Sequence, residues 1–158
     1  MFSAAALADA TGGELLAARV TGPVGEPVDA HWARLGGHGA GTAVVEMASA
    51  AGLRLVPRDR RDPGETTTRG VGELIAAALD AGAARIVVGC GDSGTSDGGS
   101  GALEALGVRI LDRDGVPLPT GGRHLREAAQ LDLTGLHPRV GEVEIVLACN
   151  LHNVLCGP

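Results

Sequence analysis

The hydrophobic pattern of the chain changes along its length. In the first part, residues 14–21 and 28–35 form two apolar-rich segments on either side of the turn sequence TGPVGEP, which predicts an antiparallel strand pair. In the second half, short apolar runs alternate with helical patterns, which predicts βαβ units and a parallel sheet. We therefore expect an α/β fold whose mixed sheet has an antiparallel N-terminal part, over a single unit of residues 1–158.

The other elements are predicted from apolar runs and from the glycines and prolines that end them. We expect the closing part of a helix at 3–10, further helices at 47–52, 66–82, 99–106 and 125–129, strands at 42–46, 85–89, 108–112 and 142–149, and a charged surface loop at 56–65. In the helix at 66–82, Leu74, Ile75, Ala78 and Leu79 form the apolar face. Gly70 and Gly72 weaken its first turn, which calls for close backbone packing or a nearby ligand.

The most distinctive sequence is GCGDSGTSDGGSG at 89–101, between a predicted strand and a predicted helix. Such a loop presents backbone N–H groups, and Ser93, Thr95 and Ser96 add hydroxyls, so it is a candidate ligand site. The carboxylates of Asp92 and Asp97 are candidates to hold Mg²⁺ or to accept a proton from a substrate hydroxyl. A structural alternative is that Asp97 caps the following helix. The spacing is not G-x-G-x-x-G, so dinucleotide binding is not implied.

Three further places carry candidate functional groups. In TTTRGVGEL, which starts with Thr66, Thr67 and Thr68, the guanidinium of Arg69 is suited to a carboxylate or a phosphate; alternatively, Thr68 simply caps the helix. Asn150, His152 and Asn153 follow a predicted buried strand and are candidates to contact a ligand. Glu46 closes an apolar strand, which suits either a structural or a functional carboxylate.

Composition excludes several classes of function. The formal net charge of −6 and the presence of only two aromatic residues argue against nucleic-acid binding. No apolar run approaches the roughly 18 residues that cross a membrane. Three cysteines without metal-ligand spacing indicate reduced thiols in a cytoplasmic protein, and the five histidines show no metal-ligand spacing either. The chain has no lysine, so a P-loop is excluded, and any phosphate must be bound by arginine, backbone N–H groups or a metal.

Several motifs in order resemble the type I glycerate kinases. The glycine loop resembles that family's G-x-G-G-S-A-T-N-D-G-G-A-G followed by A-L-G, and AVVEMASAAGL, TTTRGVGEL and the final LACNLHNVLCGP match other family segments. The resemblance implies part of a two-lobed α/β fold and transfer of the γ-phosphate of ATP, with Mg²⁺, to a hydroxyl of glycerate. Because family members are longer, it also implies that residues 1–158 are an incomplete, central unit.

The resemblance implies roles for particular residues. Asp97 would orient the acceptor hydroxyl, and Arg69 would bind the glycerate carboxylate. The substrate or its phosphates would be held by Thr67, Thr68, Ser93, Thr95, Ser96, Gly98, Gly99 and Asn153, with Glu46, Asp92 and Asn150 as further candidates.

The chain also departs from the family pattern. Asp92, Gly94 and Ser96 stand where the family usually has Gly, Ala and Asn, and Asn150 replaces an Asp. These changes leave two alternatives open: a kinase for another hydroxy acid, or a non-catalytic lobe that binds a small carboxylate or a partner. The expected partner is a small-molecule substrate, with a homodimer or association with a missing half also open.

Overall fold

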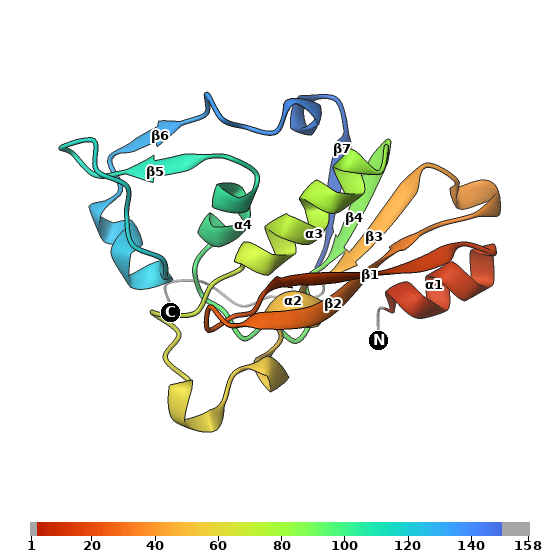
Figure 1. Cartoon of the computed structure of the whole chain (residues 1–158), viewed down its shortest axis with the longest axis horizontal. Helices are drawn as coiled ribbons and strands as arrows, with labels where there is room; N and C mark the ends of the chain where they lie inside the picture. Colours follow the sequence, from red (N-terminus) through yellow and green to blue (C-terminus); the bar gives the residue numbers. More distant parts are fainter. Residues whose placement is uncertain (1–2, 150–158) are drawn as a thin grey trace.

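The computed structural model describes residues 3–149 and has a five-stranded mixed sheet with strand order β1-β2-β3-β4-β7 (Figure 1). Its strands are β1 (Glu14–Thr21), β2 (Pro27–Arg34), β3 (Thr42–Glu46), β4 (Arg85–Gly89) and β7 (Glu144–Ala148), and a separate two-stranded sheet holds β5 (Arg109–Leu111) and β6 (Gln130–Asp132). The α-helices are α1 (Ala4–Thr11), α2 (Met47–Ala51), α3 (Arg69–Asp80) and α4 (Ser100–Ala105). The predicted α/β class and mixed sheet are confirmed.

The N-terminal part is antiparallel, as predicted. Strands β1 and β2 pair over their whole length, from Glu14 opposite Arg34 to Thr21 opposite Pro27, and β2 pairs antiparallel with β3. Helix α1 is a complete helix over Ala4–Thr11 with Ser3 as its N-cap and Gly12 as its C-cap, and not only the closing part of a helix as predicted.

Strands β3, β4 and β7 are parallel. Helices α2 and α3 lie in the crossover from β3 to β4, and α4 lies in the crossover from β4 to β7, which confirms the predicted βαβ units. The carboxyl ends of these three strands therefore meet at one edge of the sheet, where ligand sites of α/β proteins usually lie.

Buried hydrophobic side chains pack on both faces of the main sheet. Leu74 and Leu79 of α3 are fully buried and pack in one cluster with Ile86 of β4, which confirms the apolar face predicted for this helix. On the other face, Ala8 of α1 packs with Val44 of β3 in a second cluster. Both faces of β3 are thus covered, which explains its uninterrupted apolar run.

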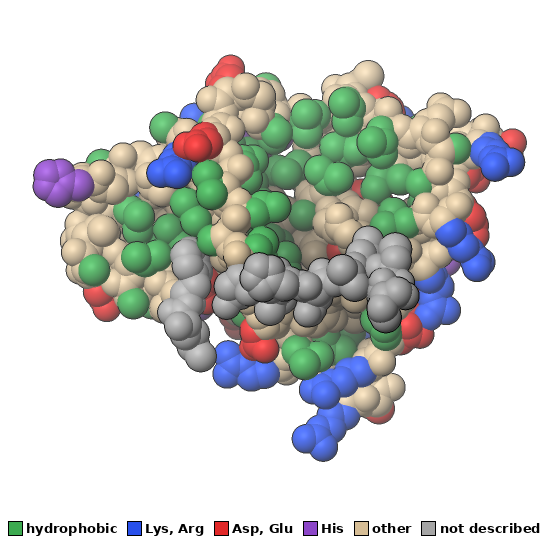
Figure 2. All heavy atoms as spheres, turned by 180° about the vertical axis from the view of Figure 1, so that it is seen from behind, with side chains coloured by type: hydrophobic (Ala, Val, Ile, Leu, Met, Phe, Trp, Pro, Cys, Tyr) green, Lys and Arg blue, Asp and Glu red, His purple; other side chains and the backbone are tan. Residues whose placement is uncertain are grey.

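The region after α4 departs most from the prediction. The strand expected at 108–112 is β5, but it pairs with β6, a strand that the pattern did not predict, outside the main sheet. The helix expected at 125–129 is instead a 3₁₀ helix over Gly122–Glu127. Exposed hydrophobic residues are frequent here, with Leu131 and Leu147 more than 60% exposed, and Figure 2 shows many hydrophobic side chains on the face seen from behind.

Among residues 3–149, no helix is both long enough and apolar enough to cross a membrane.

Candidate functional site

The glycine loop joins β4 to α4 at the carboxyl edge of the parallel sheet, as predicted. It also lies against the end of α2, because Leu53 N–H donates to the Asp92 carbonyl at 3.0 Å and Gly94 N–H donates to the Ala51 carbonyl at 2.8 Å. We call residues 92–96 its open half and residues 97–101 its anchored half, because the two halves have different surroundings.

Asp97 dominates the anchored half. Its side chain is 1% exposed, and its carboxylate accepts four hydrogen bonds. Oδ2 accepts from Thr68 N–H and Thr68 Oγ1, both at 2.8 Å, and from Gly101 N–H at 3.1 Å, while Oδ1 accepts from Gly99 N–H at 3.1 Å. The carboxylate therefore bonds to the N-terminal ends of both α3 and α4, where unpaired N–H groups favour a negative charge.

The two helices approach each other unusually closely at this carboxylate. Thr68 Oγ1 donates to Asp97 and accepts from Ala102 N–H at 3.0 Å, so Thr68 joins α3 to α4 and does not cap its own helix. A Cβ on Gly72 would lie 2.3 Å from the Ala102 carbonyl oxygen, and one on Gly101 would lie 2.1 Å from Thr67 Oγ1. Close backbone packing therefore explains the predicted weak first turn of α3.

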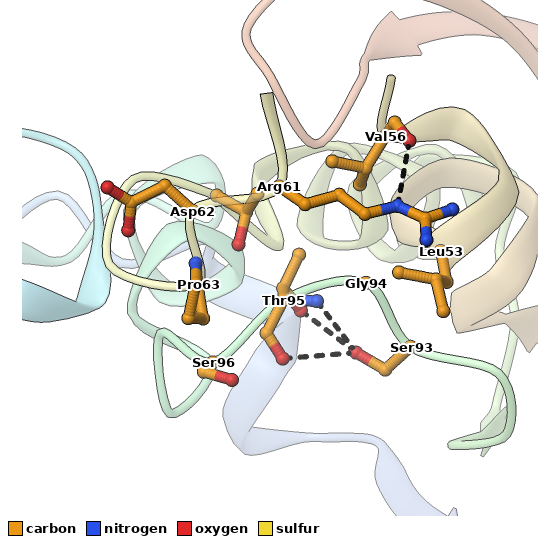
Figure 3. Close-up of a pocket in the computed structure, with 10 residues that line it drawn as sticks. Leu53, Val56, Arg61, Asp62, Pro63, Ser93, Gly94, Thr95 and Ser96 are labelled. Atoms are coloured by element: carbon orange, nitrogen blue, oxygen red, sulfur yellow. Dashed lines mark hydrogen bonds between the residues drawn. The ribbon is translucent and has the colours of Figure 1, made fainter. Parts of the chain in front are cut away.

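The open half lines a pocket with a cavity volume of about 190 Å³. Figure 3 shows the hydroxyls of Ser93, Thr95 and Ser96 along one side, with the Arg61 side chain running along the other. Ser93 Oγ and Thr95 Oγ1 are 3.0 Å apart, and Thr95 N–H donates to Ser93 Oγ at 3.2 Å. The full lining is Leu53, Val56, Arg61, Asp62, Pro63, Thr66, Ser93, Gly94, Thr95 and Ser96.

The loop after α2 is rich in charged residues, and two of them, Arg61 and Asp62, line the pocket. Figure 2 shows arginine side chains on the projection at the lower end of the molecule, and Arg54, Arg58, Arg60 and Arg61 belong to this segment. The one acidic residue in the pocket lining, Asp62, has its pKa held below the usual range by the Gly64 N–H and by Arg123. Asp62 is therefore ionised and already paired at neutral pH.

Arg69, the predicted carboxylate ligand, lies outside the pocket lining. Its Nε is 3.4 Å from Glu73 and its Nη1 is 4.0 Å from Glu104. Burial raises the pKa of Glu104, Arg69 opposes that rise, and the nearby Asp97 adds to it. Glu73 also accepts from Thr21 N–H at 2.7 Å and from Thr21 Oγ1 at 2.8 Å. Two carboxylates thus flank Arg69, which weakens its attraction for an anion.

The structure also places the remaining candidates. Glu46 accepts a hydrogen bond from Ala4 N–H at the start of α1. Asp92 has a positive φ of 55°, and its Oδ2 lies 3.8 Å from Nε of Arg54. Thr67 is buried, and its Oγ1 accepts from Arg69 N–H at 3.2 Å.

Gly98 and Gly99 have left-handed backbones at the turn into α4. Asn150, His152 and Asn153 lie outside the described residues.

Arg61 and Thr66 are among the pocket residues that the sequence did not predict as ligands. Arg61 was included only in a charged surface loop, and Thr66 only as the start of a helix motif. Both the chain from β3 to α3 and the glycine loop after β4 start at the carboxyl end of a parallel strand. This shared edge of the sheet is the signal that could have indicated Arg61 and Thr66.

The described residues do not form a magnesium site built from protein side chains alone. Residues 3–149 contain no group of three or more acidic, histidine or cysteine side chains placed to hold a metal. The carboxylate of Asp97, the strongest candidate ligand, is buried and accepts four hydrogen bonds from protein donors, three of them at Oδ2.

Cys90 follows β4 at the same edge of the sheet. Burial raises the pKa of its thiol to about 11, and the neighbouring Cys149 adds to the effect. Cys90 is therefore protonated at neutral pH and is a poor nucleophile.

A comparison with models of protein families shows to which family the chain belongs. Residues 3–158 match the model described as the glycerate kinase family. The chain belongs to this family. The chain is 51% identical to a glycerate kinase of Bacillus subtilis (strain 168) and 46% identical to a glycerate 2-kinase of Escherichia coli (strain K12), each over 152 residues.

The likeness extends to a solved structure. A protein described as glycerate kinase 2 from Salmonella typhimurium LT2 superimposes with a TM-score of 0.90 at 42% identity, over 97% of this chain and 41% of that one. Both curated relatives are matched over 96% of this chain and 39% of their own length. The chain thus spans about two fifths of the length of these glycerate kinase family members.

Proposed function

We propose that the chain carries the acceptor-binding and loop elements of a glycerate-kinase-like phosphotransferase, which moves the γ-phosphate of ATP to a hydroxyl of glycerate. The observation that carries the proposal is the polar pocket at the carboxyl end of β4, lined by the open half of the loop that matches the family signature. Phosphoryl transfer needs positioned groups and charge neutralisation more than covalent chemistry, and such a pocket supplies the positioning.

In this proposal the two halves of the glycine loop have separate tasks. The hydroxyls of Ser93, Thr95 and Ser96 bind polar oxygens of the acceptor or of the phosphate in transfer. Gly98 and Gly99 place their backbone beside that phosphate. A catalytic role of Asp97 remains a prediction: in the described geometry Asp97 holds Gly99, Gly101 and Thr68 in place and is 1% exposed, so a substrate hydroxyl would reach its carboxylate only if surrounding groups moved.

The cofactor of the proposed reaction is ATP supplied as its Mg²⁺ complex. Asn150 and Asn153 stay predicted contributors from the final segment. We place the protein in the cytoplasm, because Cys90 and Cys149 are free thiols.

The test is ADP release from MgATP with D-glycerate, measured with the 158-residue chain and with a chimera in which this chain replaces the matched segment of the B. subtilis relative. Release by either protein supports the proposal, and Ser93→Ala together with Thr95→Val should reduce it by about 10-fold or more. A folded chimera that binds MgATP but releases no ADP would contradict it.

The departures at Asp92, Ser96 and Asn150 motivate a kinase for a different hydroxy acid, which a panel of acceptors in the same assay would reveal. A non-catalytic lobe that binds a small carboxylate, pairs with itself or docks on a missing half would bind D-glycerate or self-associate without releasing ADP. The exposed Leu131 and Leu147 favour association over an isolated monomer.

A further inference from the structure

One polar atom beside the pocket has no partner within the described residues. Thr66 is 1% exposed and lines the pocket, and its Oγ1 makes no hydrogen bond there. The next two threonines are equally buried, yet Thr67 Oγ1 accepts from Arg69 N–H and Thr68 Oγ1 donates to Asp97. Of three consecutive buried threonines, the one without a partner is the one on the pocket. Leaving a buried hydroxyl without a hydrogen bond is unfavourable, so its presence at a cavity points to a ligand.

The charge of the pocket indicates which kind of ligand. Arg61 uses its Nε–H on the Val56 carbonyl at 3.5 Å, and no carboxylate of residues 3–149 lies within ion-pair distance of it. Asp62 turns away from the Arg61 guanidinium and pairs with Arg123 (Figure 3). The unpaired charge at the pocket is therefore positive, and a guanidinium matches a carboxylate well.

The size and walls of the pocket narrow the ligand further. Its volume of about 190 Å³ is well below the range of drug-sized ligand sites, so it suits a molecule of a few heavy atoms. Leu53, Val56 and Pro63 add apolar surface to the lining, which suits a short carbon chain.

We propose that this pocket is the acceptor-acid subsite, in which Arg61 binds the carboxylate of a small hydroxy acid and Thr66 Oγ1 hydrogen-bonds to its polar oxygens. The nature of the acid rests on the proposed function; the preference for a carboxylate rests on the pocket alone. Arg61 thereby takes the role that the sequence assigns to Arg69, which two glutamates flank.

The test compares binding of D-glycerate and of its uncharged amide, glyceramide, to the 158-residue chain by titration calorimetry without nucleotide. The wild-type chain should prefer the acid, and Arg61→Gln should weaken acid binding by about 10-fold while leaving glyceramide unchanged. Thr66→Val, a change of similar shape, should weaken both ligands by about 5-fold. Arg58→Gln, in the same loop but outside the pocket lining, is the control and should change neither. Circular dichroism of every variant verifies the fold.

Three results would overturn the subsite: no D-glycerate binding by the folded wild-type chain, an Arg61→Gln variant that keeps the preference for the acid, or loss of that preference in Arg69→Gln instead. These results are separate from ADP release. If the protein releases ADP and Arg61→Gln still prefers the acid over the amide, the proposed function is supported and the subsite is wrong. If the chain releases no ADP but its preference for the acid depends on Arg61, the subsite is supported and the kinase activity is not.

Discussion

Each half of the glycine loop begins with an aspartate and has small polar residues, but the two halves differ in how their polar groups are hydrogen-bonded. In the anchored half, Asp97 is buried and accepts four hydrogen bonds from protein groups. In the open half, Ser93 and Thr95 bond mainly to each other, and the hydroxyl of Thr66 beside them has no partner among the described residues. The comparison shows that polar residues alone do not mark a ligand site: satisfied groups hold the framework, and unsatisfied groups at a pocket are the better candidates for ligand contact.

The largest predicted effect is at Asp97. Asp97→Asn replaces an acceptor of four hydrogen bonds with a neutral amide whose NH₂ faces N–H donors, so we expect the free energy of unfolding to fall by about 3 kcal/mol. Urea unfolding followed by circular dichroism measures it. Ser96→Ala, in the exposed open half, is the matched control and should change stability by less than about 0.5 kcal/mol. Equal stability of the two variants would show that the anchored half is not a framework.

The second prediction concerns the contact of α3 with α4. Gly101→Ala places a Cβ 2.1 Å from Thr67 Oγ1 and 2.7 Å from the Arg69 backbone nitrogen, so the helices must separate, at a cost of about 2 kcal/mol. Thermal unfolding gives the value. Gly91→Ala is the control, because no atom lies within 4 Å of its added Cβ, and it should leave stability unchanged or raise it. A cost at Gly91 similar to that at Gly101 would contradict the close-packing explanation.

The third prediction tests the backbone of the open half. Asp92 is the one non-glycine residue with a positive φ among residues 3–149, and the family usually has glycine at this position. Asp92→Gly should therefore stabilise the chain by about 1 kcal/mol in urea unfolding. Arg54→Gln removes the exposed 3.8 Å ion pair and should have little effect, which separates backbone strain from charge. Destabilisation by Asp92→Gly would show that its carboxylate has a structural role.

The smallest predicted effect has the opposite sign to that at Asp97. Thr66→Val removes an unpaired buried hydroxyl at nearly constant volume, so the unliganded chain should gain about 0.5 kcal/mol in urea unfolding. The same change at Thr68, whose hydroxyl bonds to Asp97 and Ala102, should destabilise. A loss of stability in Thr66→Val as large as that in Thr68→Val would place the two threonines in the same framework and remove the contrast between the halves.

The main sheet and its helices could be predicted because their patterns are local. The apolar face of α3 and the continuous apolar runs of β3 and β4 identify themselves within a few residues. Strand β6 could not be predicted, because Gln130–Asp132 has only three residues and two of them are exposed. Its partner β5 is just as short, and their pairing depends on tertiary contacts.

The sequence predicted where the candidate site lies along the chain, but not which of its residues contact one another. Sequence placed hydroxyls and carboxylates at the end of β4, and left open whether Asp97 caps a helix or takes part in chemistry. The structure adds that Asp97 accepts from donors at the start of two helices, one of them in a segment 29 residues earlier in the chain. Arg61 was hidden because nothing in a run of charged residues shows which guanidinium remains unpaired.

The shared carboxylate of Asp97 also has consequences for motion. Thr68 and Gly101 donate their amide protons to the same oxygen, although Asp97 is separated from Thr68 by a span of chain that contains all of α3 and β4. Neither amide proton can exchange with water until its hydrogen bond to the carboxylate breaks. The ends of both helices hold that carboxylate in place. Their protons should therefore exchange with deuterium at nearly the same slow rate, as one cooperative opening unit that includes the starts of α3 and α4.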